Sequence, residues 1–481
     1  MQCNNPARGK IPTPWIDSLA QTGMRFTDAH SSSSVCTPTR YALLTGRYNW
    51  RSPLQKNVLY TFGGPLIKPD RLTLPAYLKR QGYRTACFGK WHLGLDWACS
   101  SEEEKLAKEF PKTPGTPPRP EQIALWQRMF SGKIGRGPTT LGFDQFFGVD
   151  LPNFPPFCYL ENDHTVGIPS TFLAAHLVGN NQASVQGPAL PGWTLEPTLP
   201  AITDRACRYI QDSAAAKQPF FLYLPLTTPH TPLAVNKEWK GKSGLNDFAD
   251  LVMETDAVVG RVLKSLKAAG VEDNTLLLFT SDNGCAHYIG IKDLEAKGHF
   301  PSGPLRGYKS DIWEGGHRIP FLIRWPGVVP AGSVCHQLVL QADLFATLAD
   351  FFGEKLPDNA AEDSISFLPI LKGHIDITTR EFAVNHSIQG MFALRQGPWK
   401  LIFGQGSGGW TKGQDNEPMQ LYNLAEDLAE RKNRAADQPE RVKAMTAQME
   451  KFVTTGRSTP GKPQPNDVPI TWKPAGNPPG K

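Results

Sequence analysis

Short apolar runs alternate with amphipathic segments along most of this chain of 481 residues. Four runs have the length and composition of buried strands: 83–88, 219–224, 275–280 and 319–325. Helices are expected between them, most clearly at 246–269, where apolar residues recur about every 3.6 positions. This alternation predicts an α/β fold in which a mixed, mostly parallel sheet is sandwiched by helices.

The character of the sequence changes near residue 355. Beyond this point short strands are expected at 381–386, 392–395 and 400–403, followed by a closing helix at 440–454. We therefore predict a large α/β domain over residues 1–354 and a smaller C-terminal α+β domain over residues 355–481.

Two stretches of the large domain, 97–138 and 151–200, lose the regular pattern. The first contains a Pro- and Lys-rich run, and some helix is expected near 122–129. Long irregular stretches in a compact protein usually carry function or are mobile.

The composition argues against several classes of protein. Hydrophobic residues make up 40% of the chain and charged residues 20%, and no run of about 18 apolar residues predicts a membrane span. The net charge of +6 is spread out, which is compatible with an anionic substrate, whereas no dense Lys/Arg block indicates nucleic acid. The eight cysteines form no Cys-x-x-Cys pair, and the chain opens with polar residues rather than a signal peptide.

The strongest functional signal is the segment 36–47, Cys-Thr-Pro-Thr-Arg-Tyr-Ala-Leu-Leu-Thr-Gly-Arg. Pro38 suits the first position of a helix and Gly46 suits its end, so a short helix is expected between them. Cys36 would then lie just ahead of a helix N-terminus, where backbone N–H groups favour an anion. From these residues alone, a thiolate nucleophile and a buried structural cysteine both stay open.

Polar clusters follow two of the predicted strands, and ligands of open α/β sheets bind outside the carboxyl ends of strands. Lys90 and His92 follow the first strand and would point to the same side of an extended chain, where they could hold an oxyanion and move a proton. Asp282 and Asn283 follow the strand at 275–280. Their oxygens suit Ca²⁺, although Asp-Asn-Gly is also common turn chemistry.

Two further candidates lie in loops. His230 follows the strand at 219–224 in a Pro-stiffened loop, where it is either a general acid or a structural histidine. Lys309 is a candidate cation for an anionic substrate, whereas its neighbours are expected to fix loops: Arg306, Glu314 and Arg318. Asp343 begins a predicted helix and is expected to be an N-terminal helix acid rather than a metal ligand.

As a set, these motifs resemble those of the type I sulfatases, a family with an alkaline-phosphatase-like fold. The resemblance rests on Cys36, Pro38 and Arg40 ahead of Leu-Thr-Gly-Arg, and on three further strings: Gly-Lys-Trp-His-Leu-Gly at 89–94, Ser-Asp-Asn-Gly at 281–284 and Arg-Gly-Tyr-Lys at 306–309. Weaker matches at 397–401, 421–424 and 456–461 extend it over nearly the full chain.

The resemblance implies a specific chemistry. Cys36 would be oxidised by a maturation enzyme to Cα-formylglycine (3-oxoalanine), which changes the nucleophile available to the site. The modified Cys36, Asp282 and Asn283 would bind one Ca²⁺. The catalytic residues for hydrolysis of a sulfate ester would be Cys36, Arg40, Lys90, His92, His230 and Lys309, of which Lys90, His230 and Lys309 would contact the sulfated small molecule or glycan. A periplasmic, secreted or lysosome-like location is also implied.

One departure from the family matters. Sulfatases usually open with an apolar strand that ends in two calcium-binding aspartates, and nothing of this kind precedes Pro12. Asp17 and Asp28 resemble other positions of the family and are not assigned as these ligands. A truncated start and an inactive homologue that binds sulfated ligands both explain the difference, and truncation is favoured because every other site residue is present. A phosphate or phosphonate ester hydrolase on the same scaffold is the remaining alternative.

Overall fold

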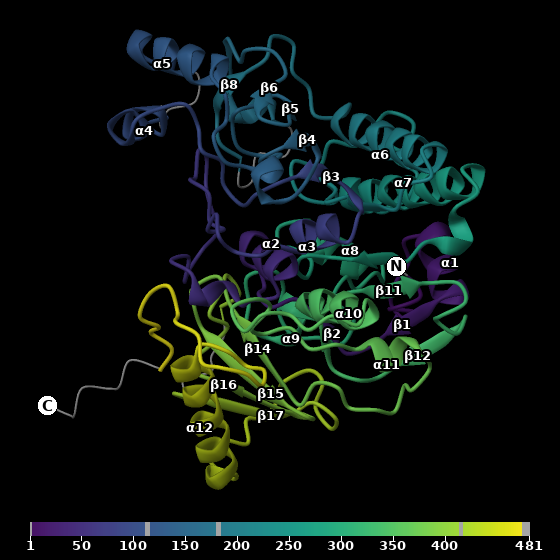
Figure 1. Ribbon diagram of the computed structural model, residues 1–481. Helices are drawn as coiled ribbons and strands as arrows, with labels where there is room; N and C mark the ends of the chain where they lie inside the picture. Colours follow the sequence, from purple (N-terminus) through teal and green to yellow (C-terminus); the bar gives the residue numbers. More distant parts are fainter. Residues whose placement is uncertain (1, 111–115, 179–183, 413–416, 474–481) are drawn as a thin grey trace, which may run out of the picture.

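The computed structural model describes residues 2–110, 116–178, 184–412 and 417–473. The first residues of the Pro- and Lys-rich run, 111–115, and the last eight residues of the chain lie outside this part. Figure 1 shows an upper α/β block, a second α/β block below it, and a C-terminal sheet at the lower left.

The upper block is built on a sheet with the strand order β6-β5-β4-β3-β9. Its strands are β3 (Arg84–Lys90), β4 (Gln145–Val149), β5 (Leu160–Glu161), β6 (His164–Thr165) and β9 (Phe220–Tyr223). β3 pairs in parallel with both β4 and β9, whereas β5 and β6 are antiparallel. Helices α6 (Thr198–Ala215) and α7 (Asp247–Ala268) lie beside this sheet (Figure 1).

The lower block has a second sheet with the order β10-β11-β1-β12. Its strands are β1 (Met24–Phe26), β10 (Leu277–Thr280), β11 (Phe321–Arg324) and β12 (Ser333–Cys335). Helix α1 (Pro14–Thr22) packs on one face through Ile16 and Leu19, which contact Leu322. Helix α11 (Leu368–Leu371) belongs to the cluster that buries Phe26 and Phe321 on the other face.

The C-terminal part contains an antiparallel sheet, β14-β15-β16-β17. The strands are β14 (Phe382–His386), β15 (Phe392–Gln396), β16 (Trp399–Ile402) and β17 (Gln420–Asn423). Helix α12 (Pro439–Thr455) covers it, and Met445, Met449 and Phe452 pack in one core with Leu394 and Leu401. The division of the chain at residue 355 stays a prediction.

The remaining elements mostly surround these sheets. The helices are α2 (Cys36–Thr45), α3 (Leu74–Arg80), α4 (Ser101–Ala107), α5 (Pro120–Ser131), α8 (Ile291–Ala296), α9 (Glu314–His317) and α10 (Leu344–Phe351), with single 3₁₀ turns at 49–51, 138–141, 175–177, 272–274 and 341–343. The short strands are β2 (Ala29–His30), β7 (Thr171–Leu173), β8 (Gly187–Ala189) and β13 (Val339–Leu340).

The irregular stretch 97–138 holds more helix than the sequence analysis predicted. Helix α4 begins after Ser100, whose hydroxyl accepts from the Glu103 N–H while the Glu103 carboxylate accepts from the Ser100 N–H. This reciprocal capping box starts the helix. The sequence carries the signal for this start as Ser-x-x-Glu at 100–103.

The predicted α/β fold is confirmed, and its sheet is present as two separate parts. β9 ends the upper sheet and β10 ends the lower one, and the described residues provide no strand between them. β9 has the apolar sequence Phe-Phe-Leu-Tyr, and β10 has the sequence Leu-Leu-Phe-Thr, which is apolar except for its last residue. Every residue of both strands is nevertheless only partly buried. Continuous apolar runs of this kind are typical of central strands that are covered on both faces.

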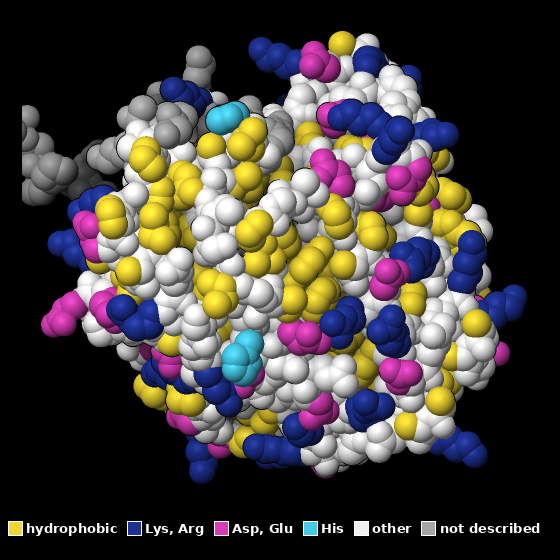
Figure 2. All heavy atoms as spheres, turned by 90° about the horizontal axis from the view of Figure 1, so that it is seen from above, with side chains coloured by type: hydrophobic (Ala, Val, Ile, Leu, Met, Phe, Trp, Pro, Cys, Tyr) yellow, Lys and Arg dark blue, Asp and Glu magenta, His cyan; other side chains and the backbone are white. Residues whose placement is uncertain are grey.

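The face above the upper block carries a mixed surface. Figure 2 shows apolar side chains gathered in its middle, with Lys, Arg, Asp and Glu side chains intermingled around them. Among the helices of the described residues, none has the length and apolar composition needed to cross a membrane.

Candidate active site

Cys36 lies at the first position of helix α2, with Val35 as the N-cap. The helix ends as predicted at Gly46, which has a left-handed φ of 64° and donates its N–H to the Ala42 carbonyl. The prediction that Pro38 opens the helix was wrong, because the helix begins two residues earlier. Cys36 nevertheless lies at the helix N-terminus as expected, because its buried side chain stands at the positive end of the helix dipole.

Cationic side chains converge on the Cys36 thiol. Burial alone would raise the pKa of this thiol, but Lys309 and Lys90 lower it well below its ordinary value, helped by the nearby His230 and His92. Lys90 and Lys309 are themselves buried. Burial lowers the pKa of Lys90 to about 8. Burial also acts to lower the pKa of Lys309, but Cys36, Tyr288 and Asp282 together raise it above its ordinary value. The pocket therefore stabilises an anion at the position of the thiol.

His92 reaches Cys36 through a turn rather than along an extended strand. β3 ends at Lys90, and His92 has a left-handed φ of 56°. The expectation of two side chains on one face of an extended chain was therefore wrong in its geometry, although both side chains do reach Cys36. His92 Nε2 lies 2.8 Å from the Leu59 carbonyl, which assigns the proton to that nitrogen and leaves Nδ1 for the thiol.

His230 contacts Cys36 from the loop after β9. Its Nδ1 lies 2.5 Å from the Thr231 carbonyl, so the Nδ1–H donates there and Nε2 remains to face the site. Burial, with the charges of Lys309 and Lys90, lowers the pKa of His230 to about 4. The imidazole is therefore neutral at pH 7 when the pocket holds no other anion.

Arg40 connects the helix to the loop after β10. Its Nε and Nη2 donate to the same Asp282 oxygen at 3.1 and 2.8 Å, and its Nη1 donates to the Lys90 carbonyl at 2.7 Å. These contacts bring Arg40, Lys90 and Asp282 together although they are far apart in the sequence. Asn283 follows, with its Nδ2 donating to the Gly284 carbonyl, and its Oδ1 is buried without a hydrogen-bond partner among the described residues.

The calcium site implied by the resemblance is only partly supplied. The unpartnered Oδ1 of Asn283 and the carboxylate of Asp282 are suitable oxygen ligands, but Arg40 already holds one oxygen of Asp282. Ca²⁺ takes about six to eight oxygens. Asp150 is a further buried carboxylate of the site, but its described hydrogen bond is with the His92 N–H rather than with Asp282 or Asn283. The present residues therefore do not make a complete calcium site.

A lysine side chain occupies the centre of a second group of possible metal ligands. His30, Glu314 and His317 bring their ligand atoms close together in a buried cluster. Lys400 Nζ lies 3.0 Å from a Glu314 oxygen and 3.1 Å from His317 Nε2, so an ammonium group takes the place of a metal ion. Glu314 also pairs with Arg318, which fits the expectation that these two residues fix a loop.

Three further residues reach the site only through the fold and were not predicted from the sequence. Asp150, just after β4, accepts the His92 N–H at 3.1 Å, and burial raises its pKa to about 6. Tyr223 of β9 contacts Arg40, and Tyr288 interacts with Lys309. For Asp150 a signal existed, because it too follows a strand. No pattern in the sequence distinguishes the two tyrosines from core residues.

Comparison with known proteins decides the family. The family model described as Sulfatase matches residues 1–354, and a model described as N-sulphoglucosamine sulphohydrolase, C-terminal, matches residues 308–458. The chain belongs to the sulfatase family. It is 33% identical to an N-acetylgalactosamine-6-O-sulfatase of Bacteroides thetaiotaomicron, over 92% of this chain and 89% of that one. Human arylsulfatase A is 30% identical over 93% of this chain and 85% of its own length.

Solved structures agree with this assignment. A structure from Bacteroides thetaiotaomicron, described under the metabolism of multiple glycosaminoglycans, matches with a TM-score of 0.77 and 30% identity, covering 92% of this chain and 94% of that one. A phosphonate monoester hydrolase of Agrobacterium radiobacter, 18% identical with a TM-score of 0.56, shares the fold alone. The sulfatase is thus a hydrolase of sulfate esters with an alkaline-phosphatase-like α/β fold, as the sequence motifs predicted.

Proposed function

We propose that this sulfatase removes sulfate from a sugar, using Cα-formylglycine formed from Cys36. The observation that carries the proposal is the convergence of Lys90, Lys309, His92 and His230 on the Cys36 thiol. A maturation enzyme would be needed for the modification, which supplies a hydrated aldehyde with two hydroxyls on one carbon. Calcium would supply positive charge beside the sulfate, held in part by Asp282 and Asn283.

The residues of the chain have separate parts in this proposal. Lys90, Lys309 and Arg40 hold negative charge that develops around the sulfate, and all three side chains are buried. His230 presents Nε2 to the site and moves a proton to the leaving alcohol. Sulfate binding beside it raises the pKa of His230 from about 4, because the added anion favours the imidazolium form. His92, held by Leu59 and Asp150, takes a proton from the nucleophile.

An aromatic cluster beside Lys309 supports a sugar as the alcohol part of the ester. Trp410 is 40% exposed, and its ring centroid lies 5.7 Å from that of His287 and 5.9 Å from that of Tyr288. The backbone N–H of Trp410 donates to Oγ of Ser310, the residue after Lys309, at 2.9 Å. An exposed aromatic face next to a sulfate-binding lysine suits a sugar ring, whose C–H groups are attracted to the negative face of the indole.

Replacing Trp410 by alanine tests the sugar part of the proposal. With N-acetylgalactosamine 6-sulfate as the substrate, we expect KM to rise about 2- to 12-fold, the equivalent of about 0.5–1.5 kcal/mol of aromatic contact, with kcat nearly unchanged. Trp410→Phe should restore most of the affinity, and inhibition by inorganic sulfate should not change. An equal loss of affinity for inorganic sulfate would contradict the proposal that Trp410 binds the sugar ring, because Trp410 would then support the sulfate pocket itself.

The same assay separates the alternatives that the sequence left open. Hydrolysis of N-acetylgalactosamine 6-sulfate and of the matching 6-phosphate is measured with the matured protein. We expect the sulfate ester to be the better substrate. Preference for the phosphate would indicate a phosphate ester hydrolase, and binding of both without turnover would indicate an inactive relative. The periplasmic, secreted or lysosome-like location stays a prediction.

A further inference from the structure

Ser310 has a backbone conformation that residues with a side chain rarely adopt. Its φ is 85°, in the left-handed region, and the residue is fully buried. Glycine takes such a conformation readily, whereas a residue with a Cβ atom does so at a cost in free energy. Strained residues persist only where the surrounding contacts enforce their conformation. Ser310 directly follows Lys309, so these contacts also bear on the lysine beside Cys36.

Three segments of the chain meet at Ser310. Its N–H donates to the carbonyl of Ser34, two residues before Cys36, at 2.9 Å, and its carbonyl accepts the Ile388 N–H at 3.1 Å. Its hydroxyl oxygen accepts the backbone N–H of Trp410 at 2.9 Å. The backbone of Ser310 is therefore held between the Cys36 segment and the residues after β14, whereas its hydroxyl binds the segment that carries Trp410.

The next residue strengthens the link to Trp410. Asp311 is fully buried, and its Oδ1 accepts the Thr411 N–H at 3.1 Å while its Oδ2 accepts the Thr411 hydroxyl at 2.5 Å. The Ser310 hydroxyl donates to Asp311 Oδ1 at 3.3 Å. Because this hydroxyl donates to Asp311 and accepts from Trp410, its orientation is fixed at both ends. Residues 310 and 311 thus hold residues 410 and 411 by consecutive hydrogen bonds.

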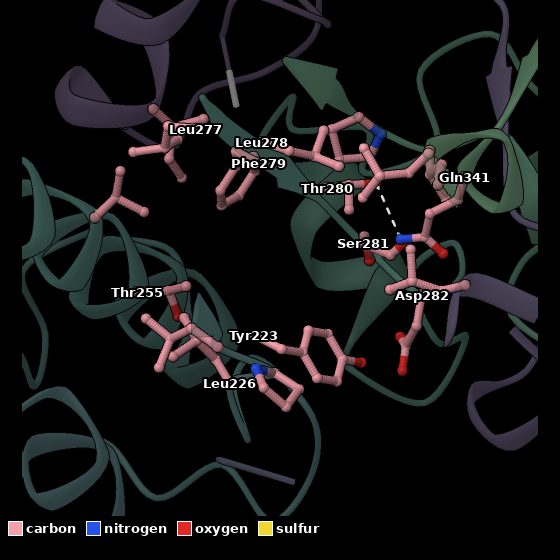
Figure 3. A pocket seen from close by; sticks show the side chains of 18 of the residues that line it. Tyr223, Leu226, Thr255, Leu277, Leu278, Phe279, Thr280, Ser281, Asp282 and Gln341 are labelled. Carbon is pink, nitrogen blue, oxygen red and sulfur yellow. Dashed lines mark hydrogen bonds between the residues drawn. The ribbon is translucent and has the colours of Figure 1, made fainter. Parts of the chain in front are cut away.

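Lys309 itself is fixed by other contacts. Its N–H donates at 2.8 Å to the carbonyl of Cys285, in the loop after β10. At the beginning of that loop Gln341 Nε2 donates to Oγ1 of Thr280 at 3.3 Å, and Figure 3 shows this bond at the edge of a cavity. The position of the lysine therefore does not depend on Trp410.

The hydroxyl is what serine adds at this position. Glycine would give the same backbone conformation without strain, and the N–H and carbonyl contacts of residue 310 would remain. Glycine would lose only the two bonds of the hydroxyl, to Trp410 and to Asp311. Asp311 already accepts from Tyr308 and Thr411, so the bond to Trp410 is the one that distinguishes serine from glycine.

We propose that Ser310 is a positioning residue that sets the place of the Trp410 ring relative to Lys309, and thereby determines which carbon of the sugar can carry the sulfate that is removed. This inference rests on the proposed function, in which Lys309 binds the sulfate and Trp410 contacts the sugar. With both side chains fixed, one position of the sulfate lets the ring lie on the indole, whereas another carries the ring away from it. Selectivity between positional isomers follows, because contact with an aromatic face depends on geometry.

The first experiment measures the link itself and needs no substrate. Ser310→Gly and Ser310→Ala both remove the hydroxyl, but only glycine accepts the left-handed φ without strain. Hydrogen–deuterium exchange is followed in a peptide that covers residues 407–412. We expect the Trp410 amide to exchange at least about tenfold faster in both variants, because its N–H has lost its acceptor. Equal exchange in the original protein and both variants would overturn the proposal.

The second experiment measures selectivity with the matured protein. Values of kcat/KM are determined for N-acetylgalactosamine 6-sulfate and for the 4-sulfate. We expect the ratio between the better and the poorer isomer to fall about 3-fold or more in both variants, through KM of the better isomer, with kcat and inhibition by inorganic sulfate nearly unchanged. An equal loss for both isomers would overturn the proposal, because a merely loosened site gives that result. A change in Ser310→Ala alone would also overturn it, because backbone conformation rather than the hydroxyl would then be responsible.

A double variant tests whether Ser310 acts through Trp410. In the Trp410→Ala protein, Ser310→Gly should change the isomer ratio by less than about 2-fold, because the ring that Ser310 positions is gone. A full additional effect there would contradict the proposal. Ser310→Gly should have a Tm no lower than that of Ser310→Ala, since glycine relieves the strain. The same loss of selectivity in both single variants then cannot be a consequence of stability.

The two proposals fail in different ways. If the original protein hydrolyses neither isomer, the proposed function is wrong and the role of Ser310 in selectivity falls with it. If the original protein hydrolyses one isomer better and Ser310→Gly keeps that ratio, the proposed function stands and the role of Ser310 is overturned. Equal hydrolysis of both isomers by the original protein would overturn it as well.

Discussion

Replacing Cys36 by serine is expected to abolish steady-state hydrolysis of sulfate esters, with a loss of about 10³-fold or more. Serine keeps one hydroxyl close to Lys90, Lys309 and Arg40, so attack on sulfur stays chemically feasible. The sulfated serine then lacks the second hydroxyl that would expel sulfate. Protein treated with substrate should therefore accumulate an adduct about 80 Da heavier, the mass of one SO₃.

Cys36→Ala is the matched control for this experiment. It removes every nucleophile at this position, so neither turnover nor the adduct is expected. The measurements are intact-protein mass and product release, made on a chain whose calcium site has been completed. Near-normal turnover by the serine variant would contradict the two-hydroxyl chemistry, and an adduct on the alanine variant would place the nucleophile elsewhere.

The second large effect concerns stability rather than catalysis. Asp343 and Arg380 form a buried ion pair in which Arg380 Nε lies 2.8 Å from one carboxylate oxygen and Nη2 contacts the other. The Asp343 oxygens also accept the N–H groups of Leu340 and Ile365. The carboxylate therefore joins the start of helix α10 to the segment that leads into the C-terminal sheet. Asp343 stands at the N-cap of helix α10 as expected, but its side chain makes no capping hydrogen bond to that helix.

Asp343→Asn should lower the free energy of unfolding by about 3–5 kcal/mol, because it leaves the Arg380 charge buried without its partner. The shape of the side chain is nearly kept, so lost packing contributes little. Asp350→Asn on the same helix is the control. That carboxylate is exposed and accepts one bond from Ser366, and we expect a change of about 1 kcal/mol or less. Urea unfolding of both variants measures the difference, and equal effects would contradict the ion-pair explanation.

Much of the site could be predicted because its residues lie at the ends of strongly patterned elements. Lys90, His230 and Asp282 each follow an apolar strand, and the rule that ligands bind at carboxyl ends of strands placed them in one pocket. Helix α2 was recognisable from Gly46 at its end. The first residue of the helix could not be predicted, because proline is tolerated throughout the first turn of a helix and Pro38 is the third residue of α2.

What could not be predicted depends on contacts between distant parts of the chain. Trp410 meets Tyr288 only after the C-terminal sheet has packed against the catalytic loops. The left-handed turn at His92 is set by the Asp150 and Leu59 contacts rather than by local sequence preference. Both apolar strands, β9 and β10, were predicted. The open edge of each strand depends on which strands pair, and the pairing cannot be predicted from the pattern within a single strand.

The proposed chemistry requires that the cationic pocket surrounds a nucleophile made from Cys36. The most direct test is the mass of the peptide that contains Cys36, isolated from protein produced together with a formylglycine-generating enzyme. We expect a peptide about 18 Da lighter than the one with cysteine, because the thiol is replaced by an aldehyde oxygen. The same peptide found only with unmodified Cys36 would contradict it.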